Sequence, residues 1–227
     1  FPLQFLGVNI KELHQGARDM RDSILKSRSI EKNPAMYSAA LLHEHGKTGK
    51  PIINTFLFSS QLESIGKWYR QLLGGSIGKE WNRDNNERVH AGLTPTVAIG
   101  STDLHSMAQL YLGGPNTTFH VFVRLEREPR EMVQTRNAFK ELLPSVQGKS
   151  LHEIMDAIYT GITQAFEEEE RPFYEITLPK PDAYAIGALL QMKMMEMMYL
   201  GVLEGVNPFD QPNVETYKKI TKRVLGG

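Results

Sequence analysis

The sequence predicts an α/β domain of three layers, in which a mostly parallel sheet lies between helices and a helical extension follows at the C-terminus. Short runs of β-branched and aromatic residues alternate with longer segments whose apolar residues recur every three or four positions. Strands that alternate with helices form parallel sheets that are covered on both faces. Because no linker or low-complexity stretch interrupts this alternation, we expect residues 1–227 to form a single domain.

Four segments have the composition of buried strands, and helices fill the intervals between them. The expected strands cover residues 51–58, 96–100, 119–125 and 174–178. The expected helices cover residues 10–29, 34–42, 60–73, 150–170 and 182–204, with another beginning near residue 103 and a last one after residue 213. Active sites of such sheets lie beyond the carboxyl ends of the strands, so we expect function in the loops after Phe58, Gly100 and Leu125.

The composition argues against several classes of protein. The 26 basic residues balance the 26 acidic ones, so no net field favours nucleic acid or an anionic membrane. The absence of cysteine excludes disulfides and thiolate metal sites and fits a reducing compartment. No carboxylate cluster accompanies His43 and His45 in the expected loop 43–50, so we expect no metal site. No apolar run approaches the roughly 20 residues of a membrane-spanning helix, and we expect a cytoplasmic protein.

The segment from residue 207 to residue 218 carries the strongest functional signal. Pro212 ends a Met-rich helix, and Asn213 is placed to cap a new one. Gln211 lies in the turn between the helices, and Lys218 follows in the new helix, so an amide and an ammonium can reach the same place. Taken alone, a lysine in a C-terminal helix is usually a solvated residue.

A second candidate lies where the strand ending near Gly100 gives way to a helix. Ser101, Thr102 and Asp103 offer groups that can cap the helix, and His105 falls in its first turn. A neutral imidazole at the carboxyl end of a strand is suited to proton transfer near pH 7. The alternative is a histidine that only packs against or caps the start of the helix.

Both segments resemble motifs of the glucose-6-phosphate isomerase family. The C-terminal segment is similar to the family signature in Phe209-Asp210-Gln211, Val214-Glu215 and Lys218, and residues 99–115 resemble the segment that carries the ring-opening histidine. The resemblance implies that His105 opens the sugar ring, that Lys218 is a catalytic cation and that Gln211 binds the substrate at its phosphate end. Asn213 stands where the family usually has glycine, a mild departure because asparagine tolerates the same left-handed backbone.

The resemblance covers nearly the whole chain and corresponds to the second half of a two-domain family. We therefore expect residues 1–227 to be the C-terminal sugar-isomerase domain of a longer protein. The resemblance implies conversion of glucose 6-phosphate to fructose 6-phosphate through an enediol, a step of glycolysis and gluconeogenesis that needs no cofactor. It also implies a homodimer, because the ring-opening histidine of the family comes from the neighbouring subunit.

One position departs from the family in a way that affects the chemistry. The family has a glutamate base directly before a Ser-x-Gly-Lys motif, and here Gly75 precedes Ser76-Ile77-Gly78-Lys79. A glycine cannot abstract a proton, and by spacing alone neither Glu80 nor Asp84 is an evident replacement. The alternative function is therefore a non-catalytic module for sugar-phosphate binding or dimerisation.

Overall fold

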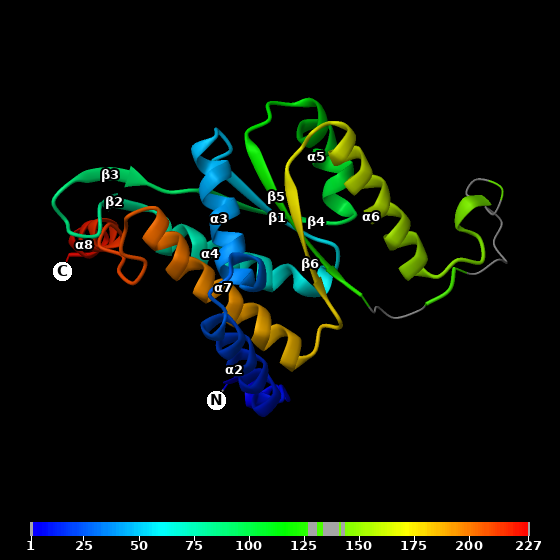
Figure 1. Ribbon diagram of the computed structural model, residues 1–227, viewed down its shortest axis with the longest axis horizontal. Helices are drawn as coiled ribbons and strands as arrows, with labels where there is room; N and C mark the ends of the chain where they lie inside the picture. Colours follow the sequence, from blue (N-terminus) through cyan, green and yellow to red (C-terminus); the bar gives the residue numbers. More distant parts are fainter. Residues whose placement is uncertain (1, 127–130, 134–140, 142–143, 227) are drawn as a thin grey trace.

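The computed structural model describes residues 2–126, 131–133, 141 and 144–226, and its centre is a four-stranded sheet (Figure 1). The strands lie in the order β4-β1-β5-β6, and every neighbouring pair is parallel. Their bounds are β1 (Ile52–Leu57), β4 (Thr94–Ile99), β5 (Thr118–Leu125) and β6 (Phe173–Leu178). All four strands lie close to their expected positions, and the predicted α/β fold with a parallel sheet is confirmed.

Helices cover both faces of this sheet. One face packs against α3 (Pro34–Lys47), α4 (Glu63–Ile77) and α7 (Ala183–Leu203), and the other against α5 (Thr102–Gly113) and α6 (Leu151–Glu168). Neighbouring residues of β1 point to opposite sides. Ile53 and Leu57 pack into the core between the sheet and α3, α4 and α7, and Phe56 packs into the aromatic core beside α5 and α6. Burial on both faces explains why the central strands β1 and β5 are buried along nearly their whole length, whereas the edge strand β6 alternates exposed and inward-facing residues.

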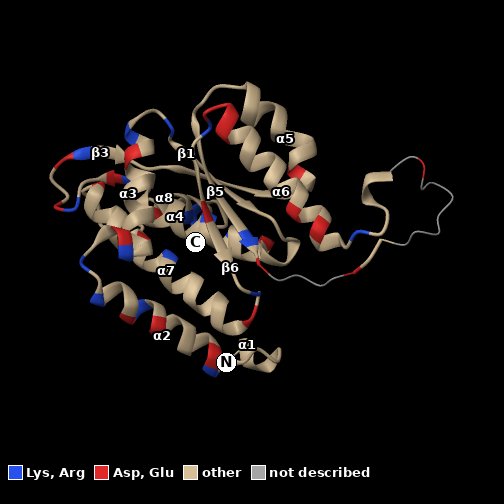
Figure 2. Cartoon of the chain, turned by 45° about the vertical axis from the view of Figure 1, so that its right-hand side comes forward, with Lys and Arg blue, Asp and Glu red and all other residues tan. Residues whose placement is uncertain are grey.

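A further helix, α2 (Ile10–Lys26), packs on the outside of α7 and carries charges of both signs on its exposed face (Figure 2). Two glycines bring the helix backbones into contact. An ideal Cβ on Gly16 would lie 2.0 Å from the carbonyl oxygen of Tyr184, and one on Gly187 would lie 2.0 Å from that of Leu13. Any side chain at either position would push the two helices apart.

The remaining elements are short or lie at the ends of the chain. They are α1 (Pro2–Phe5), α8 (Val214–Val224), the 3-10 helices η1 (Ile30–Lys32), η2 (Ser60–Leu62) and η3 (Pro144–Val146), and an antiparallel hairpin of β2 (Lys79–Trp81) and β3 (Arg88–Ala91). Neither strand of this hairpin was predicted from the sequence. Its turn, Asp84-Asn85-Asn86, has the composition of a tight turn, and Asn85 has a positive φ of 55°.

The expected loop 43–50 is largely helical, because α3 continues through Lys47. His43 Nδ1 lies 2.8 Å from Glu204 Oε1, and the ring of His45 stacks on Phe119 with the centroids 4.1 Å apart. Both histidines therefore pack against neighbouring elements. Within the described residues, no group of three or more histidine, aspartate or glutamate side chains is arranged to hold a metal ion.

Helix α7 differs from expectation in another respect, because its length and composition would allow it to cross a bilayer. In this fold α7 packs against α2, α3 and α4, and it buries Met192, Met195 and Met197. We therefore interpret its apolar character as that of a core helix.

Candidate functional site

The C-terminal segment is tied to the end of α4 by one lysine. Lys79 follows α4, and its side-chain ammonium donates hydrogen bonds to the carbonyl oxygen of Gly75, at 2.7 Å, and to that of Asp210, at 2.5 Å. The Asp210 carboxylate lies 3.7 Å from the same nitrogen, and Lys79 is only 6% exposed. Desolvation lowers the pKa of Lys79, and Asp210 opposes this shift. We call this contact between residues 75, 79 and 210 the Lys79 clamp.

The clamp brings Gln211 against Gly75. An ideal Cβ on Gly75 would lie 2.5 Å from Gln211 Nε2, so the amide occupies the space where a side chain at residue 75 would begin. The position expected to hold a base is therefore next to the residue expected to bind substrate. Among the described residues, the three heavy atoms nearest to that Cβ position all belong to the Gln211 side chain. The Glu80 carboxylate is engaged by Arg88 Nε at 3.1 Å and by Asn213 Nδ2 at 2.9 Å.

Asn213 occupies the N-cap position of α8, as expected, but its side chain makes no capping hydrogen bond. It donates to Glu80 instead and so joins the start of α8 to the β2–β3 hairpin. The expectation that the Asn213 side chain caps the helix is wrong, because the nearby carboxylate offers a stronger, charge-assisted partner.

Lys218 lies on the exposed surface of α8, one turn after Glu215 as predicted. Its Nζ donates to Glu215 Oε1 at 2.7 Å. This contact raises the pKa of Lys218 and lowers the pKa of Glu215. Lys218 is thus a charged, accessible cation that would have to exchange its carboxylate partner for an anionic ligand in order to bind one.

His105 is exposed in the first turn of α5, directly beyond the carboxyl end of β4, as the sequence predicted. Asp103 does not cap the helix. Its carboxylate accepts hydrogen bonds from the backbone N–H of Ile99, at 2.7 Å, and from the Ser106 hydroxyl, at 3.0 Å. Asp103 therefore fixes the path from the strand into the helix, and the imidazole of His105 projects from a supported turn.

The structure brings together only some of the predicted site residues. Gln211 meets Gly75, and Lys218 follows a few residues later on α8. His105 is on α5, which lies well away from α8 (Figure 1). Of the three loops predicted to carry function, most of the one after Leu125 falls outside the described residues.

Sequence reasoning missed two residues near the C-terminal segment. Lys79 was visible in the Ser-Ile-Gly-Lys motif, but nothing in the spacing showed that its ammonium would reach residue 210. His90 lines a shallow hollow of about 320 Å³ with Lys79, Glu80 and Asn213, and its φ of 46° is unusual for a residue other than glycine. His90 could have been found only by predicting the hairpin that carries it.

Comparison with known proteins identifies close similarities. The family model described as phosphoglucose isomerase matches residues 3–226. A glucose-6-phosphate isomerase from Carboxydothermus hydrogenoformans is 35% identical over 99% of this chain and 48% of its own length. One from Methanocaldococcus jannaschii is 31% identical over 99% of this chain and 53% of its own length. The chain therefore spans about half the length of these curated relatives.

Solved structures agree with these sequence similarities. The crystal structure of a hypothetical protein from Thermus thermophilus superimposes with a TM-score of 0.90 at 30% identity, over 100% of this chain and 52% of that one. A glucose-6-phosphate isomerase from Chlamydia trachomatis gives a TM-score of 0.78 at 18% identity, over 95% of this chain and 42% of that one. The second likeness concerns the fold alone.

Proposed function

We propose that this chain, which belongs to the phosphoglucose isomerase family, forms the second half of an enzyme that interconverts glucose 6-phosphate and fructose 6-phosphate. The observation that supports this proposal is the Lys79 clamp, which holds Gln211 directly against Gly75, the residue that the resemblance aligns with the family's base. A substrate bound there would contact the Gln211 amide. The Lys218 ammonium, in the first turns of α8, would be its second polar partner. The cellular setting that fits this activity is glycolysis and gluconeogenesis in the cytoplasm.

The roles follow from the charge that develops during the reaction. Aldose–ketose isomerisation moves a carbon-bound proton from C2 to C1 and a hydroxyl proton from O2 to O1 through an enediol, so the redox change is internal and no cofactor is required. Lys218 would stabilise negative charge that develops on a sugar oxygen, and Gln211 would donate hydrogen bonds toward the phosphate end. His105 would transfer the proton that opens the sugar ring.

The separation of α5 and α8 favours a site that is shared between two copies of the chain. In one copy, the helix that carries His105, α5, and the helix that carries Lys218, α8, lie at different ends of the molecule (Figure 1). A homodimer in which each copy lends its His105 to the other would bring the two groups together. The half of the family architecture that this chain does not span would supply most of the phosphate-binding loop.

A calorimetric titration with fructose 6-phosphate, run beside a coupled isomerase assay, tests the proposal. We expect Lys218→Ala to weaken fructose 6-phosphate binding by about tenfold or more, since it removes a cation from the site. Lys222→Ala on the same exposed helix is the matched control and should leave affinity unchanged. Both variants should unfold at the wild-type temperature, because exposed ion pairs contribute little to stability. Equal affinities in the two variants would exclude Lys218 from the site.

A second candidate function, a non-catalytic module that binds sugar phosphate or mediates dimerisation, is favoured by the contact between Gly75 and Gln211. The space of the missing base is filled by an amide, and the Glu80 carboxylate is held by Arg88 and Asn213. Fructose 6-phosphate binding without detectable turnover would support this candidate over the isomerase.

A further inference from the structure

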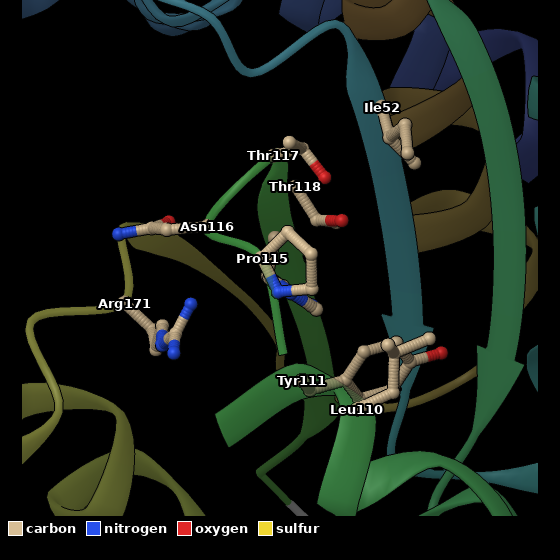
Figure 3. A pocket seen from close by; sticks show the side chains of 9 residues that line it. Ile52, Leu110, Tyr111, Pro115, Asn116, Thr117, Thr118 and Arg171 are labelled. Atoms are coloured by element: carbon tan, nitrogen blue, oxygen red, sulfur yellow. The ribbon is translucent and has the colours of Figure 1, made fainter. Parts of the chain in front are cut away.

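A second pocket lies at the opposite ends of the strands from His105. It has a volume of about 250 Å³ and opens beside the amino-terminal residues of β1 and β5, between the C-terminal half of α5 and the loop that follows α6 (Figure 3). The residues that line it are Ile52, Leu110, Tyr111, Pro115, Asn116, Thr117, Thr118, His120 and Arg171. None of these residues takes part in the site proposed above.

Arg171 is incompletely paired in this pocket. Its Nη2 donates to the carbonyl oxygen of Leu112, but Nε and Nη1 are buried, and no acceptor among the described residues reaches them. A buried donor without an acceptor costs roughly 1–3 kcal/mol, and more when the group is charged. Native proteins satisfy most such groups with protein atoms, water or a ligand. The Arg171 guanidinium is therefore the group in the pocket that lacks hydrogen-bond acceptors among the described residues.

The floor of the pocket is polar but carries no opposing charge. His120 is 1% exposed, and its Nδ1 lies 3.2 Å from Asn54 Nδ2. The Oδ1 atom of Asn54 accepts a hydrogen bond from the Thr96 hydroxyl. Desolvation, and then the charge of Arg171, lowers the pKa of His120 to about 3. With this imidazole neutral, Arg171 is the one charged side chain among the described residues that line the pocket.

We propose that this pocket binds a small monoanionic carboxylate with an apolar body. One guanidinium matches one negative charge, whereas a phosphate dianion would bring an excess charge into a pocket with a single cation. Leu110, Pro115 and Ile52 offer apolar contacts, and Figure 3 shows Arg171 and Asn116 on one side, Ile52 on the other, and Pro115 and Thr118 between them. The volume corresponds to about eight non-hydrogen atoms if each takes the roughly 30 Å³ of a water molecule in the liquid.

Benzoate is a suitable probe, because its carboxylate and ring have the required charge and size. In a titration of the ¹⁵N-labelled chain followed by NMR, we expect saturable shifts in residues 110–120 and at Arg171, with a dissociation constant at or below about 1 mM. Benzamide, the neutral analogue, and inorganic phosphate should each bind at least about tenfold more weakly. Arg171→Met should weaken benzoate binding by about tenfold or more, whereas Arg70→Met, at an exposed arginine of α4, should not.

Four outcomes would overturn the proposal. They are the absence of shifts at about 10 mM benzoate, equal binding of benzamide, tighter binding of phosphate, and shifts confined to residues 207–218. If Arg171→Met does not fold, Thr117→Phe tests the proposal instead. Thr117 is exposed at the mouth of the pocket, so the phenylalanine ring can fill the pocket without disturbing the core. Benzoate binding should then be lost, and retained binding would contradict the assignment to this pocket.

Discussion

At the scale of single residues, the contact between Gly75 and Gln211 defines the space that a side chain at residue 75 would need. The absent side chain leaves a space beside the last turn of α4, and the Gln211 amide occupies it. The far end of a glutamine is flexible, so a new side chain at residue 75 can displace it without moving backbone. If residue 75 corresponds to the family's base, as proposed, its replacement by glycine is structurally reversible.

We expect Gly75→Glu to raise isomerase turnover by about 10² or more, the usual contribution of a general base, if the other groups are in place. Gly75→Gln is the matched control, because it has the same size and also displaces Gln211 but offers no base. A coupled assay with glucose 6-phosphate measures the effect. Equal turnover in the two variants would mean that displacement of Gln211, and not proton abstraction, explains any change.

His120 should make stability depend on pH. Its pKa is about 3 in the folded chain and about 6.5 when unfolded, so the unfolded chain binds more protons between these values. The contribution of this neutral histidine to the free energy of unfolding is complete above pH 6.5 and is lost as the pH falls toward 3. We expect a loss of up to about 3 kcal/mol in the free energy of unfolding between about pH 7 and pH 4.

Urea denaturation of wild type and His120→Phe across this pH range isolates the effect from that of titrating carboxylates. The phenylalanine variant should lose less stability on acidification, because it has no imidazole to protonate on unfolding. His14→Gln, at an exposed histidine of α2, should follow the wild-type curve. Parallel curves for wild type and His120→Phe would show that His120 is not held neutral in the fold.

At the scale of elements, α7 combines an apolar surface with a buried ion pair. Lys193 is 3% exposed and Glu196 is 0% exposed, and Lys193 Nζ lies 2.7 Å from Glu196 Oε2. Tyr69 and Ser38 also donate to this carboxylate, and Lys193 donates to the Tyr174 hydroxyl at 2.8 Å. Desolvation lowers the pKa of Lys193, but the Glu196 carboxylate outweighs it and raises the pKa overall. The network thus joins α3, α4 and β6 to α7.

We expect Lys193→Met to destabilise the chain by about 3–5 kcal/mol, because the Glu196 carboxylate would stay buried without its counter-ion. The double variant Lys193→Met with Glu196→Gln should be more stable than the single one, since it buries no unpaired charge. Urea denaturation measures both. A double variant that is less stable than Lys193→Met would show that the hydroxyl donors, rather than Lys193, are the main support of Glu196.

Elements with strong periodicity were predictable from sequence, whereas those set by tertiary contacts were not. The parallel strands were found because runs such as residues 51–58 must be apolar on both faces. The end of α3 was misplaced because Gly46 suggested a loop, while the packing of His43 and His45 on Glu204 and Phe119 extends the helix. The β2–β3 hairpin was missed because its strands are short and rich in charged residues, and β3 is largely exposed.

At the scale of the whole molecule, the residues of the candidate site were predictable but their distances were not. Motif spacing placed His105 on α5 and Lys218 after a turn. Which of them meet depends on the order of strands and on which face each helix covers. The proximity of Gln211 to Gly75, and the separation of α5 from α8, emerge only from that arrangement (Figure 1).

A site that is shared between subunits predicts complementation. His105→Ala and Lys218→Ala should each abolish turnover, and an equimolar mixture that exchanges subunits should recover about a quarter of wild-type activity. Half of the dimers would then be mixed, and each mixed dimer would hold one intact site. Sedimentation should show a dimer. A mixture that remains inactive after verified exchange would indicate that both groups act within one subunit.

The Lys79 clamp has a consequence for how this sequence can change over time. Its two hydrogen bonds end on the carbonyl oxygens of residues 75 and 210, atoms that every amino acid possesses. Replacement of the side chain at residue 75 therefore leaves these acceptors in place. Mutation can change the side chain at residue 75 while the segment that carries Gln211 and Lys218 stays docked. At residue 75 the backbone carbonyl holds the clamp and the side chain sets the chemistry, so selection can change the side chain without disturbing the clamp.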